Sequence, residues 1–208
     1  MNARGHFISF EGIDGSGKST QARLLAEALR GQGREVVLTR EPGGSAGAEE
    51  IRNLVLTGAG DRWSPETEVL LFTAARRDHL ERVIAPAIGR GAVVISDRFA
   101  DSTRVYQGVG RADLRPLVDE LHRLVIGQEP DLTLLIDIDP ATGLARAGAR
   151  GGAEARFESF GLGLQERLRA GFLALADEAP GRVVVIDGAG APHAVAAEVA
   201  RVVAARLT

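Results

Sequence analysis

One short stretch near the N-terminus constrains this chain more than any other part of its sequence. It fits the phosphate-binding loop pattern G-x-x-x-x-G-K-[ST] in full, and it consists of Gly12, Ile13, Asp14, Gly15, Ser16, Gly17, Lys18, Ser19 and Thr20. Glycines let backbone N–H groups close around phosphate oxygens, and a following helix directs its positive N-terminus at them. The lysine reaches the outer phosphates, and the serine hydroxyl is a ligand for Mg²⁺. The stretch therefore predicts a bound nucleoside triphosphate.

The flanking sequence favours a true phosphate-binding loop over a glycine-rich turn that matches by chance. A strand-like run, Phe7–Phe10, precedes the loop, and Gln21–Arg30 follows with leucines and alanines on one helical face. The chain has 25 basic residues, and Lys18 is the only lysine among them. Lysine is a compact point charge and arginine a broad planar fork, so the two do not interchange in a narrow phosphate cradle.

Composition limits the remaining possibilities. A length of 208 residues suits a single α/β domain, so we expect one domain over residues 1–208. The net charge of −3 gives no general attraction to nucleic acid or to an anionic membrane. The absence of cysteine excludes disulfides and thiolate chemistry, and the histidines show no ligand spacing, so the only metal we expect is carried by the nucleotide. No apolar run has the length of a membrane span, which favours a cytoplasmic enzyme.

Short apolar runs alternate with helical patterns along the whole chain. The runs that read as strands are Phe7–Phe10, Glu35–Thr39, Ala92–Ser96, Leu132–Ile138 and Arg182–Ile186. Apolar helix faces are marked by Leu80, Val83, Ile84, Ala87 and Ile88, by Leu117, Leu121, Leu124 and Val125, and by a last amphipathic helix over Ala194–Leu207. This alternation predicts a parallel sheet covered by helices on both sides, with ligands at the carboxyl ends of the strands.

Charged residues follow two of these strands where a sheet would otherwise simply turn. The second strand leads into Arg40 and Glu41, and the third leads into Asp97 and Arg98. A surface ion pair between Asp97 and Arg98 is one interpretation, and such a pair would add little stability. Their position at the end of a buried strand, on the edge where the phosphate loop lies, favours a role with Mg²⁺ and phosphate instead.

A set of short motifs resembles the bacterial thymidylate kinase family over nearly the whole chain. In order, these motifs are Phe10–Gly12, Thr39–Gly44, Glu50–Arg52, Leu71–Arg76, Asp97–Phe99, Tyr106–Gly108 and Pro130–Thr133. The resemblance implies a P-loop nucleoside monophosphate kinase fold, with a five-stranded parallel sheet flanked by helices and a small mobile lid at about 146–160. It also implies phosphoryl transfer from ATP to dTMP with Mg²⁺, giving dTDP and ADP for dTTP synthesis, and a homodimer.

The resemblance further implies an acceptor site in which each side chain has a role. Phe72 would stack on the thymine ring and Arg76 would bond its edge, although a core Phe72 and a solvated Arg76 are the alternative. Tyr106, the only tyrosine, would lie under the sugar and disfavour a 2′-hydroxyl. Thr103 and Gln107 match positions that read the base, and Arg52 and Arg98 match binders of the monophosphate group. The full set of implied acceptor-site residues is Asp14, Glu41, Pro42, Arg52, Phe72, Arg76, Arg98, Thr103, Tyr106 and Gln107.

Catalysis would come from positioning and positive charge, because the acceptor phosphate is already ionised at neutral pH. The implied catalytic residues are Lys18, Arg98, Asp14, Arg150 and Arg156, with Arg146 at ATP and with Ser19 and Asp97 at the metal. Gly15 and Ser16 stand where some members carry an arginine, so the chain resembles the type whose basic residues come from the lid. The candidate lid arginines, Arg146, Arg150 and Arg156, could instead form a solvated helix face. Ala155, Phe160 and Arg104 depart from the family pattern.

Other functions stay open to different degrees. A GTPase would need a base-reading Asn-Lys-x-Asp loop, which Lys18 as the only lysine excludes, and a motor-type ATPase would need two acids where Asp97 and Arg98 stand. Another nucleoside or nucleoside monophosphate kinase is the closest alternative. A non-catalytic ATP-binding protein is a third.

Overall fold

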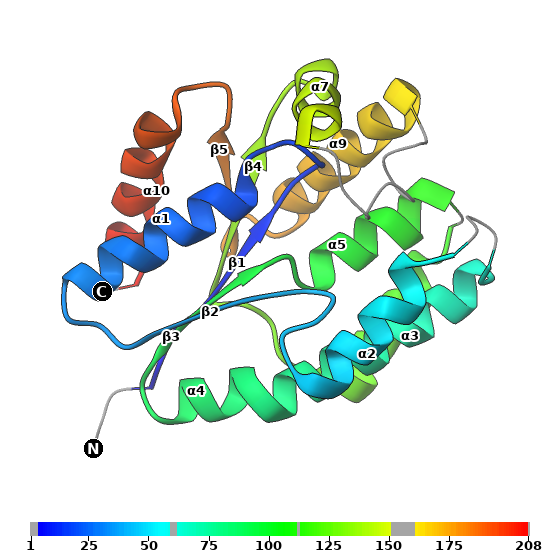
Figure 1. The fold of residues 1–208 in the computed structure, drawn as a ribbon, viewed down its shortest axis with the longest axis horizontal. Coiled ribbons are helices and arrows are strands. Elements are labelled where there is room, and N and C mark those ends of the chain that lie inside the picture. The colour runs from blue at the N-terminus through cyan, green and yellow to red at the C-terminus, as the bar shows by residue number, and fades with distance from the viewer. Residues whose placement is uncertain (1–3, 59–61, 112, 151–160, 208) are drawn as a thin grey trace.

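The computed structural model describes residues 4–58, 62–111, 113–150 and 161–207, and a five-stranded parallel sheet lies at its centre (Figure 1). The strands are β1 (Phe7–Glu11), β2 (Val36–Arg40), β3 (Val93–Asp97), β4 (Leu132–Asp137) and β5 (Val183–Asp187). Their order across the sheet is β2-β3-β1-β4-β5, with every neighbouring pair parallel. The predicted sheet is therefore confirmed, with each strand boundary within one residue of its expected place.

Helices cover both faces of this sheet. The α-helices are α1 (Lys18–Gly31), α2 (Ala46–Leu56), α3 (Pro65–His79), α4 (Ala85–Gly89), α5 (Ala100–Val105), α6 (Arg115–Leu121), α7 (Pro140–Arg150), α9 (Gly161–Glu178) and α10 (Pro192–Arg206). Turns of π-helix extend three of them, as η1 (Leu80–Ile84), η2 (Tyr106–Arg111) and η3 (His122–Ile126). Figure 1 shows α1 and α10 on one side of the sheet, and α4, α5 and α9 on the other. The α/β class predicted from the sequence is confirmed.

Side chains of β1 alternate between the two layers, as the strand period of two requires. Ile8 and Phe10 belong to the core beneath α1 and α10, whereas Phe7 belongs to the core on the opposite face. The Phe7 ring packs edge-on against Phe99, with their centroids 4.9 Å apart. Burial on both faces fixes the register of β1, and therefore fixes the place at which the phosphate-loop sequence leaves the sheet.

One predicted apolar helix face proved wrong. Leu124 and Val125 on η3 are 62% and 37% exposed, and the residues that face the core are Val118, His122 and Ile126. The pattern was misassigned because the inward face includes a histidine, which the apolar count treats as polar.

Among the described residues, no helix is long and apolar enough to cross a membrane.

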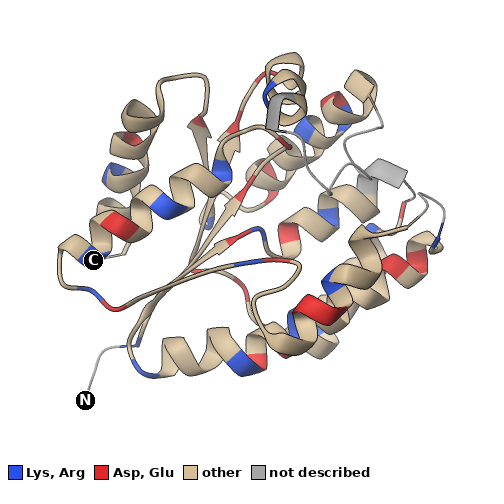
Figure 2. Ribbon diagram, viewed as in Figure 1, with Lys and Arg blue, Asp and Glu red and all other residues tan. Residues whose placement is uncertain are grey.

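Charges are distributed over most of the described helices, with both signs interspersed (Figure 2). Helix α3 shows how local sequence sets a boundary: the hydroxyl of Ser64 accepts a 3.2 Å hydrogen bond from the Thr67 N–H, and Pro65 follows the cap. This cap fixes the start of the helix that carries Phe72, Arg76 and His79.

Candidate active site

The phosphate-loop sequence forms a tight turn between β1 and α1. Gly17 caps α1 in a left-handed conformation with φ of 95°. Gly15 has φ of 79°, and a Cβ atom there would lie 1.9 Å from the carbonyl oxygen of Gly143 on α7. Both conformation and space therefore require glycine at position 15. The loop consequently packs directly against the beginning of α7.

Lys18 is the first residue of α1, and its side chain is buried within the loop. Its Nζ atom donates a 3.2 Å hydrogen bond to the Ile13 carbonyl and lies 3.6 Å from Oδ1 of Asp14. Burial and the nearby charge of Arg98 lower the pKa of Lys18, whereas Asp14 acts in the opposite direction. A buried ammonium group with these neighbours is well suited to an anionic ligand.

Arg98 and Asp14 form the charged contact between the third strand and the loop. Nη2 of Arg98 donates to Oδ1 of Asp14 at 2.5 Å, and the Tyr106 hydroxyl donates to the other carboxylate oxygen at 3.0 Å. Burial alone would raise the pKa of Asp14, but Arg98 and Lys18 outweigh burial and lower it to about 2. Arg98 also has φ of 73°, a strained conformation for a residue other than glycine. Such strain at a charged residue is typical of a functional site.

Glu11 lies behind this contact, and its role was not anticipated from the sequence. Its carboxylate accepts hydrogen bonds from the Phe99 N–H at 2.7 Å and from the Ser102 hydroxyl at 2.6 Å. The same hydroxyl accepts a 2.9 Å bond from Arg98. Burial and the charge of Asp101 raise the pKa of Glu11 to about 7. The charged residue at the very end of β1 was the available signal, because parallel strands end at the ligand edge.

A pocket opens beside Asp14 and brings together every residue expected at the acceptor site. Its lining comprises Asp14, Glu41, Pro42, Arg52, Leu56, Phe72, Arg76, Arg98, Phe99, Ser102, Thr103, Tyr106 and Gln107. Leu56, Phe99 and Ser102 were not expected there. The pocket combines apolar and aromatic walls with a few charged groups, which is typical of a small-molecule site.

Arg76 is fixed deep in this pocket. Its Nε atom donates to Glu41 at 2.7 Å, and its Nη2 atom donates to the Thr103 hydroxyl at 2.9 Å and to the Phe99 carbonyl at 3.2 Å. The residue is only 4% exposed, so the alternative of a solvated arginine is wrong. His79, which the sequence did not single out, supports Glu41 through a 3.0 Å contact from its Nδ1 atom. Its spacing of three residues from Arg76 on one helix was the available signal.

A second pocket lies on the other side of the phosphate loop. Its lining includes five of the ten residues expected at the ATP site together with residues near α10, and it comprises Gly15, Ser16, Gly17, Thr20, Gln21, Arg146, Gly188, Gly190, Pro192 and Val195. Gln21 ties the two sides together, because its Nε2 atom donates a 2.9 Å bond to the Pro192 carbonyl. The segment 188–195 carries no sequence motif, so only the fold could reveal its place in this pocket.

Two of the expected residues offer oxygen atoms to a metal. Oδ1 of Asp97 is buried and has no hydrogen-bond partner among the described residues, and Ser19 is exposed at the start of α1. Carboxylate and hydroxyl oxygens are the hard donors that Mg²⁺ prefers. The donor chemistry of these residues therefore fits the metal expected from the sequence.

The expected lid lies mostly beyond the described residues. Arg146 on α7 is described, and its Nη1 atom lies 3.5 Å from the Gly188 carbonyl. Arg150 ends α7, but its side chain lies outside what the structure describes. Ala155, Arg156 and Phe160 fall in the gap between residues 150 and 161.

A phosphate-binding loop between two pockets, at the carboxyl ends of a five-stranded parallel sheet, is the arrangement of the P-loop nucleoside monophosphate kinase fold. A family model described as thymidylate kinase matches residues 10–199. A thymidylate kinase from Ruegeria pomeroyi is 67% identical over 207 residues, covering 100% of this chain and 98% of the relative. One from Geobacter sulfurreducens is 49% identical and covers 98% of each chain.

Solved structures agree with the sequence relatives. The crystal structure of thymidylate kinase from Ehrlichia chaffeensis matches with a TM-score of 0.78 and 38% identity, covering 97% of this chain and 99% of that one. The chain therefore belongs to the thymidylate kinase family, and it is an enzyme of that family, whose reaction is ATP-dependent phosphorylation of dTMP.

Proposed function

We propose that this chain transfers the γ-phosphoryl group of ATP to dTMP, with the two nucleotides bound in the two pockets on either side of the phosphate loop. The observation that carries the proposal is the split between adjacent residues: Asp14 lines the first pocket, and Gly15 lines the second. Phosphoryl transfer needs donor and acceptor phosphates in line at one point. A loop shared by both pockets supplies that point.

In this proposal the first pocket holds the acceptor. Phe72 offers an aromatic face to the thymine ring, while Arg76 and Gln107 offer donors to its edge. Arg52 and Arg98 bind the monophosphate group. The hydrogen bond from Arg98 to Asp14 fixes the guanidinium beside the phosphate loop. An acceptor phosphate bound to Arg98 would therefore lie next to that loop.

The second pocket holds ATP in this proposal. Backbone N–H groups of the loop from Gly12 to Thr20 would surround its phosphates, and Arg146 lines the pocket together with Gly15, Ser16, Gly17 and Thr20. Lys18 and Arg98 provide fixed positive charge at the transferring group, which stabilises charge that develops in the transition state. Arg150 and Arg156 would add charge from a lid at about 146–160.

Ser19 and Asp97 would hold Mg²⁺. When bound there, Mg²⁺ supplies positive charge to the phosphates and lowers the cost of bringing two anionic nucleotides together. Asp97 ends β3 directly before Arg98, so the metal ligand and the phosphate-binding arginine would be positioned by the same strand end.

The proposal also covers the domain extent, the location and the oligomeric state of the chain. We place the activity in a single domain over residues 1–208, located in the cytoplasm where both substrates would be met. Exposed leucines support a homodimer, because Leu70 on α3 is 54% exposed and Leu124 on the neighbouring η3 is 62% exposed. Ile84 and Ala87 are fully buried in the core and take no part in this exposed surface.

The test is ADP release from ATP and Mg²⁺ with dTMP, dUMP, dCMP, AMP or thymidine as the acceptor. The proposal expects strong stimulation by dTMP and a smaller response to the others. Preference for another acceptor would assign the chain to a different nucleotide kinase. ATP binding without stimulation by any acceptor would favour a non-catalytic nucleotide-binding protein.

A further inference from the structure

Helix α5 has two polar faces, and only one of them borders the acceptor pocket. Ser102 and Thr103 face the site, where their hydroxyls bond Arg98 and Arg76 respectively. Asp101 and Arg104 face away from it and bond each other at 2.7 Å. The helix therefore connects the acceptor pocket to a second group of charges that the proposed reaction does not use.

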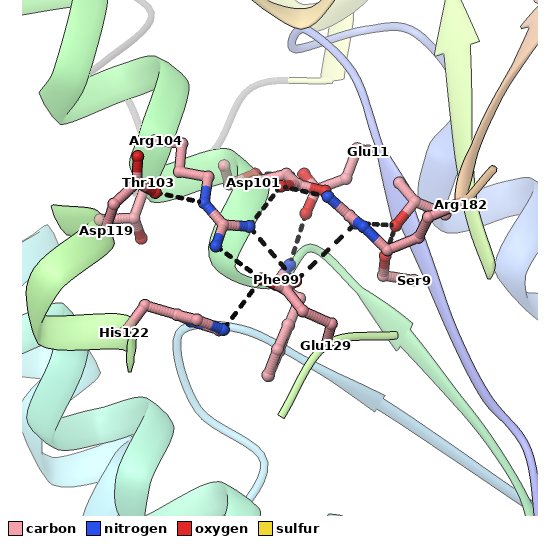
Figure 3. A network of polar contacts seen from close by, with 12 residues as sticks. Ser9, Glu11, Phe99, Asp101, Thr103, Arg104, Asp119, His122, Glu129 and Arg182 are labelled. Atoms are coloured by element: carbon pink, nitrogen blue, oxygen red, sulfur yellow. Dashed lines mark hydrogen bonds and ion pairs between the residues drawn. The ribbon is translucent and has the colours of Figure 1, made fainter. Parts of the chain in front are cut away.

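Asp101 is the centre of this second group (Figure 3). Its Oδ2 atom accepts a 2.6 Å bond from Nη1 of Arg182, and its Oδ1 atom accepts bonds from Nη1 of Arg104 and Nη2 of Arg182. The residue is 3% exposed. Burial alone would raise the pKa of Asp101, but Arg182 and Arg104 outweigh burial and lower it, so the carboxylate stays ionised.

Arg182 ties α5 to the sheet. It lies directly before β5, and its Nη1 atom also donates a 2.7 Å bond to the Thr133 hydroxyl on β4. That hydroxyl lies 2.8 Å from the hydroxyl of Ser9 on β1. A continuous chain of polar contacts thus runs from β1 through Arg182 to Asp101 (Figure 3).

Arg104 ties the same helix to its other neighbours. It donates to Asp119 on α6 at 2.8 Å and to Glu129, before β4, at 2.6 Å. Nε2 of His122 lies 3.1 Å from the same Glu129 carboxylate. Residues from separate segments therefore hold the polar side of α5, while Ala100 and Val105 pack its apolar side into the core. The charged contacts thus help to set the rotation and height of the helix.

We propose that Asp101 and Arg182 are positioning residues for the acceptor nucleotide, because their ion pair sets where α5 presents Ser102 and Thr103 to Arg98 and Arg76. This inference rests on the proposed function and names residues behind the acceptor pocket. Ser102 and Thr103 each contact an arginine that lines that pocket. A small displacement of α5 would move both arginines, and misplacement of reacting groups by about 1 Å can cost around 100-fold in rate.

The test compares steady-state kinetics of Arg182→Met, Asp101→Asn and the double variant with those of the full wild-type chain. Each single variant should raise KM for dTMP by roughly 10-fold while KM for ATP changes by less than about 2-fold. The double variant leaves no unpaired buried charge, so it should fold even if Arg182→Met does not. Its KM for dTMP should resemble that of the single variants, because all three lose the same contact.

Two further variants separate positioning from stability. Arg182→Lys keeps the charge but loses the planar fork, so it should recover part of the lost dTMP affinity. Val199 lies on α10 and packs in a hydrophobic cluster that includes no residue of α5. Val199→Ala removes methyl groups from that cluster, so it should lower the melting temperature without changing the ratio of the two KM values.

The outcomes are distinct. A selective rise in KM for dTMP, partly recovered in Arg182→Lys, supports the inference. Equal changes in both KM values, or a lower melting temperature alone as in Val199→Ala, would overturn it while the proposed function stands. A wild-type chain that does not phosphorylate dTMP would overturn the proposed function, and this inference with it.

Discussion

Nε of Arg76 donates a 2.7 Å hydrogen bond to Oε2 of Glu41, and the two side chains are only 5% and 4% exposed. One partner lies on α3 and the other directly follows β2, so the pair joins the acceptor-pocket helix to the edge of the sheet. Removing water from both charges is costly, and the pair is tolerated only because each has its partner. Loss of either residue alone should therefore affect both stability and dTMP binding.

Replacing Arg76 with methionine tests this expectation. We expect KM for dTMP to rise by about 100-fold, because Arg76 is a donor at the base edge in the proposed complex, and stability to fall by about 3 kcal/mol, because Glu41 stays buried without its cation. Denaturant unfolding and acceptor kinetics measure the two effects. Arg76→Met combined with Glu41→Gln should recover stability without recovering dTMP affinity. Recovery of both would show that Arg76 acts only on the fold.

Lys18 should be required for turnover and dispensable for folding. Lys18→Ala should reduce kcat by at least about 100-fold, because a fixed positive charge at the transferring group is lost. Lys18→Arg should also be strongly impaired, since the broad guanidinium does not fit the space occupied by the ammonium group. Circular dichroism and single-turnover kinetics separate folding from chemistry. An arginine variant with wild-type kcat would refute the argument from the only lysine.

The sheet was predictable because its signal is local. Buried parallel strands read as short apolar runs, and the polar residues after them, Glu41, Asp97 and Arg98, follow from the rule that such strands end at one ligand edge. The resemblance added the order of the acceptor residues, and the fold brings all of them to one pocket. The strands and their charged ends need no knowledge of how distant segments meet, whereas the acceptor set came from the resemblance.

The contacts behind the pocket were not predictable, because they join segments with no shared period. Asp101, Arg182 and Glu129 come from three different places in the chain, and nothing in their local sequence indicates that they meet. Arg104 departs from the family pattern, and only the fold shows that three carboxylates surround it. The exposure of Leu124 was missed for another reason: the inward face of this helix includes His122, which an apolar pattern counts as polar.

We expect the ring of Tyr106 to discriminate between deoxyribonucleotide and ribonucleotide acceptors, and its hydroxyl to support the site. Tyr106→Ala should raise kcat/KM for the ribonucleotide of thymine relative to dTMP by about 10-fold, because space opens where a 2′-hydroxyl would lie in the proposed complex. Tyr106→Phe is the matched control: it keeps the ring and removes the hydroxyl, which bonds Asp14 and Arg98. Competition between the two acceptors measures the ratio. An unchanged ratio in the alanine variant would assign discrimination to another group.

Glu11 should make stability depend on pH near neutrality. Burial and Asp101 raise its pKa from 4.5 to about 7 in the folded state, so folding favours the neutral carboxyl group. That contribution is fully present below about pH 4.5 and is lost as the pH rises through about 7. Stability of the wild type should therefore fall between about pH 5 and pH 8 by on the order of 3 kcal/mol, since a tenfold change in a protonation equilibrium corresponds to about 1.4 kcal/mol.

Glu11→Gln removes the titrating group and should flatten this pH dependence. Chemical denaturation of both proteins across the same range measures the difference in slope. Glu198→Gln is the control, because the exposed Glu198 pairs with Arg201 and its pKa is lowered by that hydrogen bond, so it titrates below the range. The glutamine variant at position 11 would retain the full wild-type slope if another buried group, rather than Glu11, takes up the proton near neutral pH.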